Sequence, residues 1–291
     1  MFEGLLVHPK TADSIELFLK APSHALLISG PQGAGKLTLA KAIAAALLEI
    51  APDKLGSYPH FTHIAREESK QDISIDAIRQ ANKSLRLQIP GKARIRRIVL
   101  VEDADLMNQE AQNAFLKSLE EPNDDAAIIL TSSTKTGLLP TVISRAFTIE
   151  ARPVSLAQAK QFFKDASDKD LAAAWNLSQG APGLLAALIS GDDNELKQAV
   201  DQAKTWLSKT RYNRLLEVDT LSRNKTELAA LLDGLARVIK ALYRNSASKN
   251  LDAQTTKLLA AMQIVISSRK ALDTNVLPRL VALRLTLSLP I

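Results

Sequence analysis

A glycine-rich turn constrains this chain more than any other feature. It lies within the sequence ALLISGPQGAGKLT of residues 25–38, where the apolar run 25–28 predicts a buried strand and a helix is predicted to begin near Leu37. Gly30, Gly35 and Lys36 have the spacing of a phosphate-binding loop. In such a loop, backbone N–H groups and the helix N-terminus attract an anion, and the lysine reaches the terminal phosphates. A plain glycine turn between a strand and a helix is the alternative interpretation.

The residue after the lysine departs from the phosphate-loop pattern. A Ser or Thr at this position provides a hydroxyl ligand for Mg²⁺, whereas this chain has Leu37. Thr38 follows one position later, and a rotation of about 100° per helical residue directs its hydroxyl away from the ion. The sequence therefore predicts a loop that holds phosphates but lacks the usual metal ligand.

Composition excludes several classes of protein. The chain has 291 residues, no cysteine and four scattered histidines, so disulfides and thiolate metal sites are excluded and no zinc is expected. The longest apolar run is far shorter than the ~20 residues that span a bilayer. The first ten residues also lack the basic-then-apolar order of a signal peptide. We therefore expect a cytoplasmic protein that makes no membrane contact.

The charge pattern leaves the question of nucleic acid open. A net charge of +6 permits such contact without requiring it, and an aromatic content of 4% argues against a base-stacking surface. Lys92, Arg94, Arg96 and Arg97 form the densest basic cluster. Such a run is typical of a solvated loop, and contact with DNA phosphates or with an acidic partner is the alternative.

A second apolar run, residues 98–101, ends in the acids Glu102 and Asp103. A continuous apolar run is typical of a central parallel strand. Downstream of a phosphate loop, the first acid of such a pair holds Mg²⁺ and the second orients the attacking water. The alternative is a capped loop, in which Asp105 or Asn108 opens the next helix.

Strands and helices alternate through residue 150, which predicts a three-layer α/β domain with a parallel sheet over residues 1–150. One predicted strand ends in polar residues, of which Thr131 or Ser132 is expected near a γ-phosphate. Beyond this domain the pattern is helical, and we expect a small helical domain at 151–192 and an all-α domain at 193–291. The other predicted strands are 59–64, 128–131 and 147–150, and the helices before residue 150 are 9–20, 39–50, one starting at Ser74, and 108–121.

Four segments together resemble AAA+ ATPases and, within them, the bacterial clamp-loader subunits of DNA polymerase III. They are HALLISGPQGAGKLTLA (24–40), RIVLVEDADLMNQEAQNAFLKSLEEP (97–122), LPTVISR (139–145) and NVLPRLVALRLTL (275–287). The second segment is the most specific, and the resemblance is weakest over residues 195–270. Among the clamp-loader subunits, the chain is most similar to the delta-prime group. The resemblance implies an AAA+ domain, then a helical lid and a helical collar that joins subunits.

The resemblance also implies roles for individual residues. It implies an ATP or ADP site, with Glu102 as the acid that holds Mg²⁺ and Asp103 as the second, catalytic acid. Arg145 falls on the arginine that a clamp-loader subunit offers in trans to its neighbour's ATP, and a solvated or salt-bridged arginine is the alternative. The nucleotide-binding positions that the resemblance implies are Gly30, Pro31, Gly33, Ala34, Gly35, Lys36, Leu37, Thr38 and Thr131.

Several positions differ from the family pattern. Besides Leu37, the acid pair reads Glu-Asp instead of Asp-Glu, so the catalytic acid is one methylene shorter. The basic residue of sensor 2, expected near Gly183, is absent, and Ala146 replaces the cysteine of the Ser-Arg-Cys motif. Three elements of hydrolysis are therefore altered, and effects within one site are seldom independent. We expect weak or no ATPase activity from the chain alone.

The resemblance implies a delta-prime-like subunit that supports ATP-dependent loading of the sliding clamp onto primed DNA. Its implied partners are gamma/tau-like and delta-like subunits in a hetero-pentamer, the sliding clamp, and primed DNA through the assembled complex. A gamma/tau-like motor that hydrolyses ATP by itself is one alternative. Another is an AAA+ protein that remodels DNA without a clamp, although no helix-turn-helix or basic aromatic segment is evident.

Overall fold

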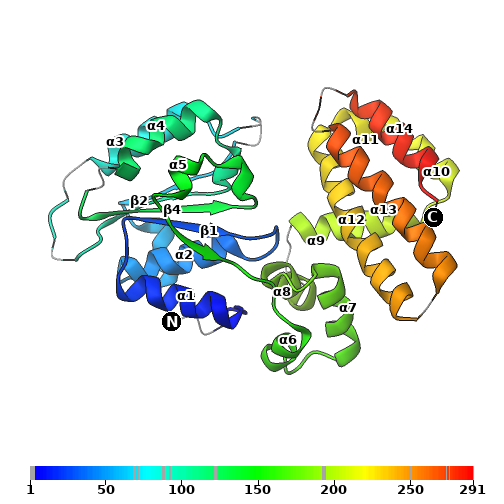
Figure 1. Ribbon diagram of the computed structural model, residues 1–291, viewed down its shortest axis with the longest axis horizontal. Coiled ribbons are helices and arrows are strands. Elements are labelled where there is room, and N and C mark those ends of the chain that lie inside the picture. Colours follow the sequence, from blue (N-terminus) through cyan, green and yellow to red (C-terminus); the bar gives the residue numbers. More distant parts are fainter. Residues whose placement is uncertain are drawn as a thin grey trace. The chain divides into compact units, whose positions relative to one another are not determined.

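The computed structural model describes residues 4–67, 70, 72–86, 89–91, 93–120, 123–191, 195–249, 251–272, 274 and 276–290. The chain divides into two compact units, Met1–Val154 and Ser155–Ile291. The first contains strands and helices, and the described part of the second is helical (Figure 1).

A parallel five-stranded sheet forms the centre of the first unit. Its strands run in the order β2-β3-β4-β1-β5, and every neighbouring pair is parallel. The three central strands consist of buried residues, because both faces of the sheet are covered. The predicted α/β fold with a parallel sheet is confirmed. The strands are β1 Ala25–Ser29, β2 Phe61–Ile64, β3 Arg97–Val101, β4 Ala126–Ser132 and β5 Phe147–Glu150.

Helices on both faces of the sheet create two separate hydrophobic cores (Figure 1). Side chains alternate across β1, so Leu26 and Ile28 pack with Ile43 of α2, whereas Leu27 packs in the other core with Phe115 of α4. This arrangement gives the three layers expected from the sequence. The helices of this unit are α1 Pro9–Lys20, α2 Lys36–Leu47, α3 Ile75–Leu85, α4 Gln109–Glu120 and α5 Pro140–Ile143, with short 3₁₀ turns η1 Pro52–Ser57, η2 Ala104–Leu106 and η3 Lys135–Gly137.

A hydrophobic core in the second unit is formed largely by α9, α12, α13 and α14. The helices α9 and α12 approach closely at Gly234, where a Cβ atom would collide with the carbonyl oxygen of Ala199. Residues 192–194, at the expected boundary between lid and collar, lie outside the described residues, and the division into these two domains stays a prediction. The helices are α6 Leu156–Phe162, α7 Asp168–Ser178, α8 Pro182–Ser190, α9 Glu195–Ser208, α10 Arg211–Leu216, α11 Val218–Arg223, α12 Lys225–Ser248, α13 Asp252–Leu272 and α14 Pro278–Ser288.

The basic cluster before β3 differs from the solvated loop that the sequence predicts. Arg97 is only 2% exposed, and its guanidinium lies 3.8 Å from the Asp125 carboxylate, which also pairs with Arg96 at 3.0 Å. Arg94 is exposed and donates a hydrogen bond to the carbonyl of Pro22, whereas Lys92 lies outside the described residues. Two of the four cations therefore anchor the start of β3. The prediction failed because it used only neighbouring residues, whereas Asp125 is nearly thirty residues away in the sequence.

None of the described helices combines the length and apolar character needed to cross a membrane.

Candidate phosphate-binding site

The glycine-rich turn connects the end of β1 to the start of α2 and has the backbone shape of an anion cradle. Gly33 and Gly35 have φ angles of 80° and 77°, in the left-handed region that favours glycine. Gly30 has no room for a side chain, because a Cβ atom there would lie 2.6 Å from the carbonyl oxygen of Ala151. Gly35 is the N-cap of α2 and provides no side-chain acceptor, so the first N–H groups of the helix remain available to a ligand.

Lys36 places a buried ammonium group at this turn. Its side chain is 8% exposed, and its Nζ donates hydrogen bonds to the Ser133 hydroxyl at 3.0 Å and to the carbonyl of Pro31 at 3.4 Å. Burial lowers the pKa of Lys36, and the nearby carboxylates of Asp103 and Asp105 oppose this shift. Both oxygens that accept from this ammonium group are neutral. A negatively charged phosphate would form a stronger hydrogen bond with it.

The two acids that follow β3 have opposite electrostatic environments. Glu102 accepts a hydrogen bond from Nε2 of His63 at 3.0 Å, and this bond lowers the pKa of the Glu102 carboxyl. Burial raises the pKa of Asp103, although Lys36 opposes the shift. Asp103 also has a φ of 45°, which is uncommon outside glycine but tolerated by Asp and Asn. The acids are therefore not interchangeable: one carboxylate is favoured in its charged form and the other is penalised.

Polar side chains at the end of β4 lie beside the lysine and the acids, and the placement of Thr131 or Ser132 near a γ-phosphate stays a prediction. Thr131 is 1% exposed, and its Oγ1 accepts a hydrogen bond from the Asp103 backbone N–H at 2.9 Å. The hydroxyl of Ser132 donates to the carbonyl of Thr134. Ser133 is the residue that reaches Lys36, and its backbone N–H donates to Asp105 at 3.2 Å.

Sequence reasoning therefore missed Ser133 and Asp105 as members of the site. The polar run TSSTK at the strand end was the available signal, but it could not show which hydroxyl lies beside the lysine. Asp105 was considered as a cap of the next helix. Asn108 has that role instead, since its Oδ1 accepts from the Ala111 N–H at 2.8 Å.

The residue after Lys36 provides no oxygen ligand for a metal ion. Leu37 is partly buried and packs against the core between α1, α2 and the sheet, whereas Thr38 is exposed. Among the described residues, no group of three or more His, Asp or Glu side chains could hold a metal ion. Glu102, the expected Mg²⁺ ligand, is engaged by His63. The residues fit a phosphate group, and the role of Glu102 as a Mg²⁺ ligand stays a prediction.

Arg145 lies in the turn between α5 and β5. Its guanidinium forms an ion pair with Glu120, at the end of α4, at 2.7 Å and donates to the carbonyl of Thr141 at 2.9 Å. The side chain is 34% exposed. Its contacts thus come from α4 and α5, not from the phosphate loop of its own chain.

Gly183, near which a sensor 2 base was expected, lies in α8 of the second unit. The next residue, Leu184, is completely buried. This position therefore contributes to packing within its unit.

The raised pKa of Asp103 predicts how its removal changes stability with pH. Between the ordinary value of 3.8 and the raised pKa, the folded state binds more protons than the unfolded state, so stability falls as pH rises. Asp103→Asn, which tolerates the same backbone angle, is expected to raise the free energy of unfolding at pH 7. The gain should shrink towards pH 4. Urea denaturation at both pH values is the measurement.

Glu102→Gln is the matched comparison, because the pKa of Glu102 is lowered. Its charged form contributes stability above the ordinary pKa, which is lost as pH falls through the lowered one. Glu102→Gln is therefore expected to destabilise the chain at pH 7. Equal changes of the same sign in the free energy of unfolding of both variants would contradict the opposite pKa shifts of Asp103 and Glu102.

Comparison with known proteins is consistent with this geometry. A family model described as DNA polymerase III, delta subunit matches residues 16–155, slightly under half of the chain. The DNA polymerase III subunit delta′ of Pseudomonas aeruginosa is 36% identical over 139 residues, which are 42% of this chain and 41% of that protein. Its counterpart in Escherichia coli strain K12 is 30% identical over 199 residues, or 62% and 58%. The chain thus spans about half the length of the curated relatives it matches.

A solved structure extends the likeness of fold to the whole chain. It is a DNA polymerase III gamma subunit-related protein from Thermotoga maritima, with a TM-score of 0.53 and 20% sequence identity. The superposition covers 96% of this chain and 97% of that one. At this identity the match establishes the fold alone.

Proposed function

We propose that the chain is a delta-prime-like member of the clamp-loader family and serves as a clamp-loader subunit of bacterial DNA polymerase III. The observation that carries the proposal is the match of residues 16–155 to the family model of the DNA polymerase III delta subunit, because this segment contains both the phosphate loop and Arg145. In this role the subunit supports ATP-dependent loading of the sliding clamp onto primed DNA.

We infer that the phosphate loop holds ATP or ADP passively. The backbone N–H groups of Gly33, Gly35 and Leu37 and the ammonium of Lys36 would bind the phosphates, whereas the Ala34 N–H donates to the carbonyl of Pro31. Bound Mg²⁺ would neutralise phosphate charge, with Glu102 as the acid that the family pattern assigns to it. Hydrolysis by this site is weak or absent in the proposal, because Leu37 provides no oxygen and Asp103 is shorter than the usual glutamate.

Arg145 supports the same proposal from outside the loop. It is partly exposed, and its ion-pair partner Glu120 is itself 48% exposed. A pair between exposed groups contributes little stability, typically about 0–1 kcal/mol. The guanidinium can therefore exchange Glu120 for the phosphate of a neighbouring subunit at small cost. In this role Arg145 completes the neighbour's ATP site.

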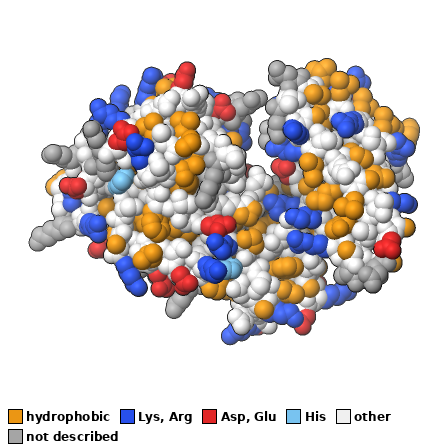
Figure 2. Space-filling model, in the orientation of Figure 1, with side chains coloured by type: hydrophobic (Ala, Val, Ile, Leu, Met, Phe, Trp, Pro, Cys, Tyr) orange, Lys and Arg blue, Asp and Glu red, His pale blue; other side chains and the backbone are white. Residues whose placement is uncertain are grey.

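Exposed apolar side chains support assembly through the second unit. Of the twelve large apolar side chains exposed among the described residues, ten lie beyond residue 195. Leu259 and Ile266 are seven residues apart on α13, and Leu280 and Leu287 are seven apart on α14, so each pair lies on one helix face. Figure 2 shows apolar side chains across the surface that carries these helices. The proposed partners are gamma/tau-like and delta-like subunits in a hetero-pentamer.

Reconstitution with gamma-like and delta-like subunits from the same organism tests this function. We expect a stable complex that loads the sliding clamp onto primed DNA, and loss of loading when this chain is omitted. The purified chain alone should show little phosphate release. Robust turnover by the chain alone, abolished by Lys36→Ala, would instead identify a gamma/tau-like motor. Unimpaired clamp loading without the chain would overturn the proposal.

A further inference from the structure

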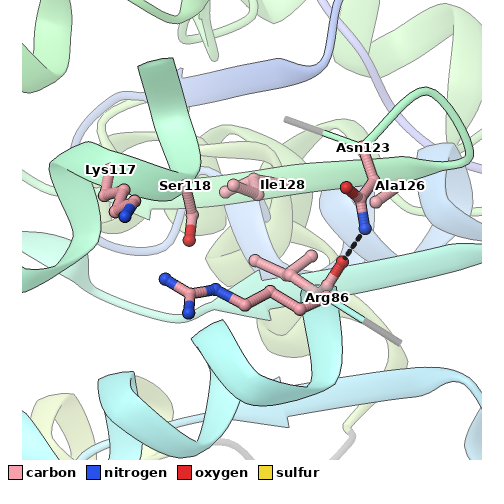
Figure 3. A pocket seen from close by; sticks show the side chains of 7 residues that line it. Arg86, Lys117, Ser118, Asn123, Ala126 and Ile128 are labelled. Carbon is pink, nitrogen blue, oxygen red and sulfur yellow. Dashed lines mark hydrogen bonds between the residues drawn. The ribbon is translucent and has the colours of Figure 1, made fainter. Parts of the chain in front are cut away.

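A hollow lies in the first unit, far from the phosphate loop. It has a volume of about 200 Å³ and opens between the ends of α3 and α4 (Figure 3). Ala126 and Ile128 form part of its floor and lie at the amino end of β4. The carboxyl end of the same strand contacts the phosphate site. The seven residues of β4 place these two ends roughly 20 Å apart. The hollow is therefore independent of the proposed nucleotide site.

The lining of this hollow combines an apolar floor with a basic rim. Leu85, Ala126 and Ile128 supply aliphatic carbon, and Arg86 and Lys117 supply positive charge. In Figure 3 the Arg86 side chain extends beneath Ser118 on the side where Lys117 lies. No ion pair or hydrogen bond engages either cationic side chain within the described part of the chain.

The rim continues along α3 as a basic groove. A second hollow of about 550 Å³ shares Arg86 and is also lined by Arg79 and Lys83. These three cations are spaced four and three residues apart, so they lie on one face of the helix. Asp76, which pairs with Arg79 at 3.3 Å, is the one acid among the described residues that line the two hollows.

Neighbouring hydrogen bonds fix the shape of the hollow. The Ser118 hydroxyl donates to Oδ1 of Asn82 at 2.7 Å, which joins α4 to α3. The Asn123 side chain donates to the carbonyl of Leu85, a bond drawn in Figure 3. The floor is thus held from α3, from α4 and from the connection that precedes β4. A preformed hollow limits the entropy that a ligand must lose on binding.

We propose that this groove and hollow bind an acidic peptide segment of a partner protein. One apolar side chain of the segment enters the hollow and contacts Leu85 and Ile128. Carboxylates on either side of it pair with Arg86 and Lys117, and further acids follow Lys83 along α3. Charge complementarity of this kind sets specificity and increases the association rate.

Size and composition favour a peptide over single-stranded nucleic acid. A volume of 200 Å³ is below the roughly 300–1,000 Å³ of drug-sized ligand sites, so it suits a single side chain. Proteins that bind single strands stack bases on aromatic side chains, and none lines either hollow among the described residues. The aliphatic floor offers no such platform.

Fluorescence anisotropy with the full chain tests the proposal. The probe is a labelled twelve-residue peptide of Asp and Glu with a single central Leu, at about 150 mM salt so that non-specific attraction is screened. Arg86→Glu combined with Lys117→Glu is expected to weaken binding at least tenfold. Replacing the central Leu of the peptide by Ser should weaken it severalfold without any change in the protein.

The matched control is Lys10→Glu combined with Lys54→Glu, which changes the net charge equally at two exposed lysines of the same unit. Its binding should change less than twofold. Equal loss in both double variants, no dependence on the central Leu, or no binding by the unaltered chain would overturn the proposal. Tighter binding of a twelve-residue oligo-dT than of the peptide, lost with Arg86→Glu and Lys117→Glu, would overturn it in favour of nucleic acid.

Discussion

Replacing Arg145 by alanine is expected to lower ATP turnover at the neighbouring site of an assembled clamp loader by roughly 10³–10⁵-fold, the range measured for arginine fingers. The guanidinium would stabilise negative charge that develops on the transferred phosphoryl group, so its loss affects the rate more than nucleotide binding. The measurement is phosphate release by an assembly in which only that neighbouring site retains its catalytic residues. This design prevents turnover at other sites from concealing the loss.

The stability of the subunit should barely change in this variant, because the Arg145–Glu120 pair is partly exposed. Arg152→Ala is the matched control. Arg152 is also an arginine of the first unit with an ion pair at 2.7 Å, in this case to Glu150, and its side chain is 43% exposed. An assembly with Arg152→Ala should keep its turnover. Full activity with Arg145→Ala would show that this arginine is only a surface ion-pair residue.

The second large effect is expected from Lys36→Ala on nucleotide affinity. Removing one charge from a buried, hydrogen-bonded pair costs about 2–5 kcal/mol, which corresponds to roughly 30-fold to several thousand-fold in Kd. Lys36 is buried beside the turn whose glycines open the backbone N–H groups to an anion, so its ammonium would contact the phosphates directly. Calorimetric titration with ADP and with ATP measures the change.

Lys41→Ala is the control for this substitution, because Lys41 is on the same helix but exposed. The nucleotide affinity of the Lys41→Ala variant should stay within about threefold of that of the unaltered chain, as expected for a screened surface charge. Failure of the unaltered chain to bind either nucleotide would contradict the phosphate-site interpretation. So would equal affinities of the Lys36→Ala variant and the unaltered chain.

Much of the fold could be predicted because its signals are local. The apolar run before Gly30 and the one before Glu102 each mark a buried parallel strand, and the structure places β1 and β3 there. The pattern of the phosphate loop is equally local, since its glycines and Lys36 all lie within residues 30–36. The strand order, with β1 between β4 and β5, was not predicted, because it depends on pairing between segments far apart in the sequence.

Features that depend on distant residues could not be predicted. Arg97 was predicted in a solvated loop because the residues next to it in sequence are basic. In the structure it is buried, with its guanidinium near the carboxylate of Asp125. The sequence likewise could not select Ser133 over Thr131 beside Lys36. Which hydroxyl accepts from Lys36 depends on how the ends of β4 and β3 are placed. The Thr131 hydroxyl already accepts from the Asp103 N–H, and the Ser133 hydroxyl accepts from Lys36.

The packing of Leu37 has a consequence for metal binding. Its side chain belongs to the core that supports α2, so the position serves the fold as well as the loop. Replacing Leu37 by serine would remove apolar carbon that packs against that core, while adding a hydroxyl at the position that holds Mg²⁺ in the phosphate-loop pattern. Gain of a metal ligand and loss of packing are therefore coupled at this one position.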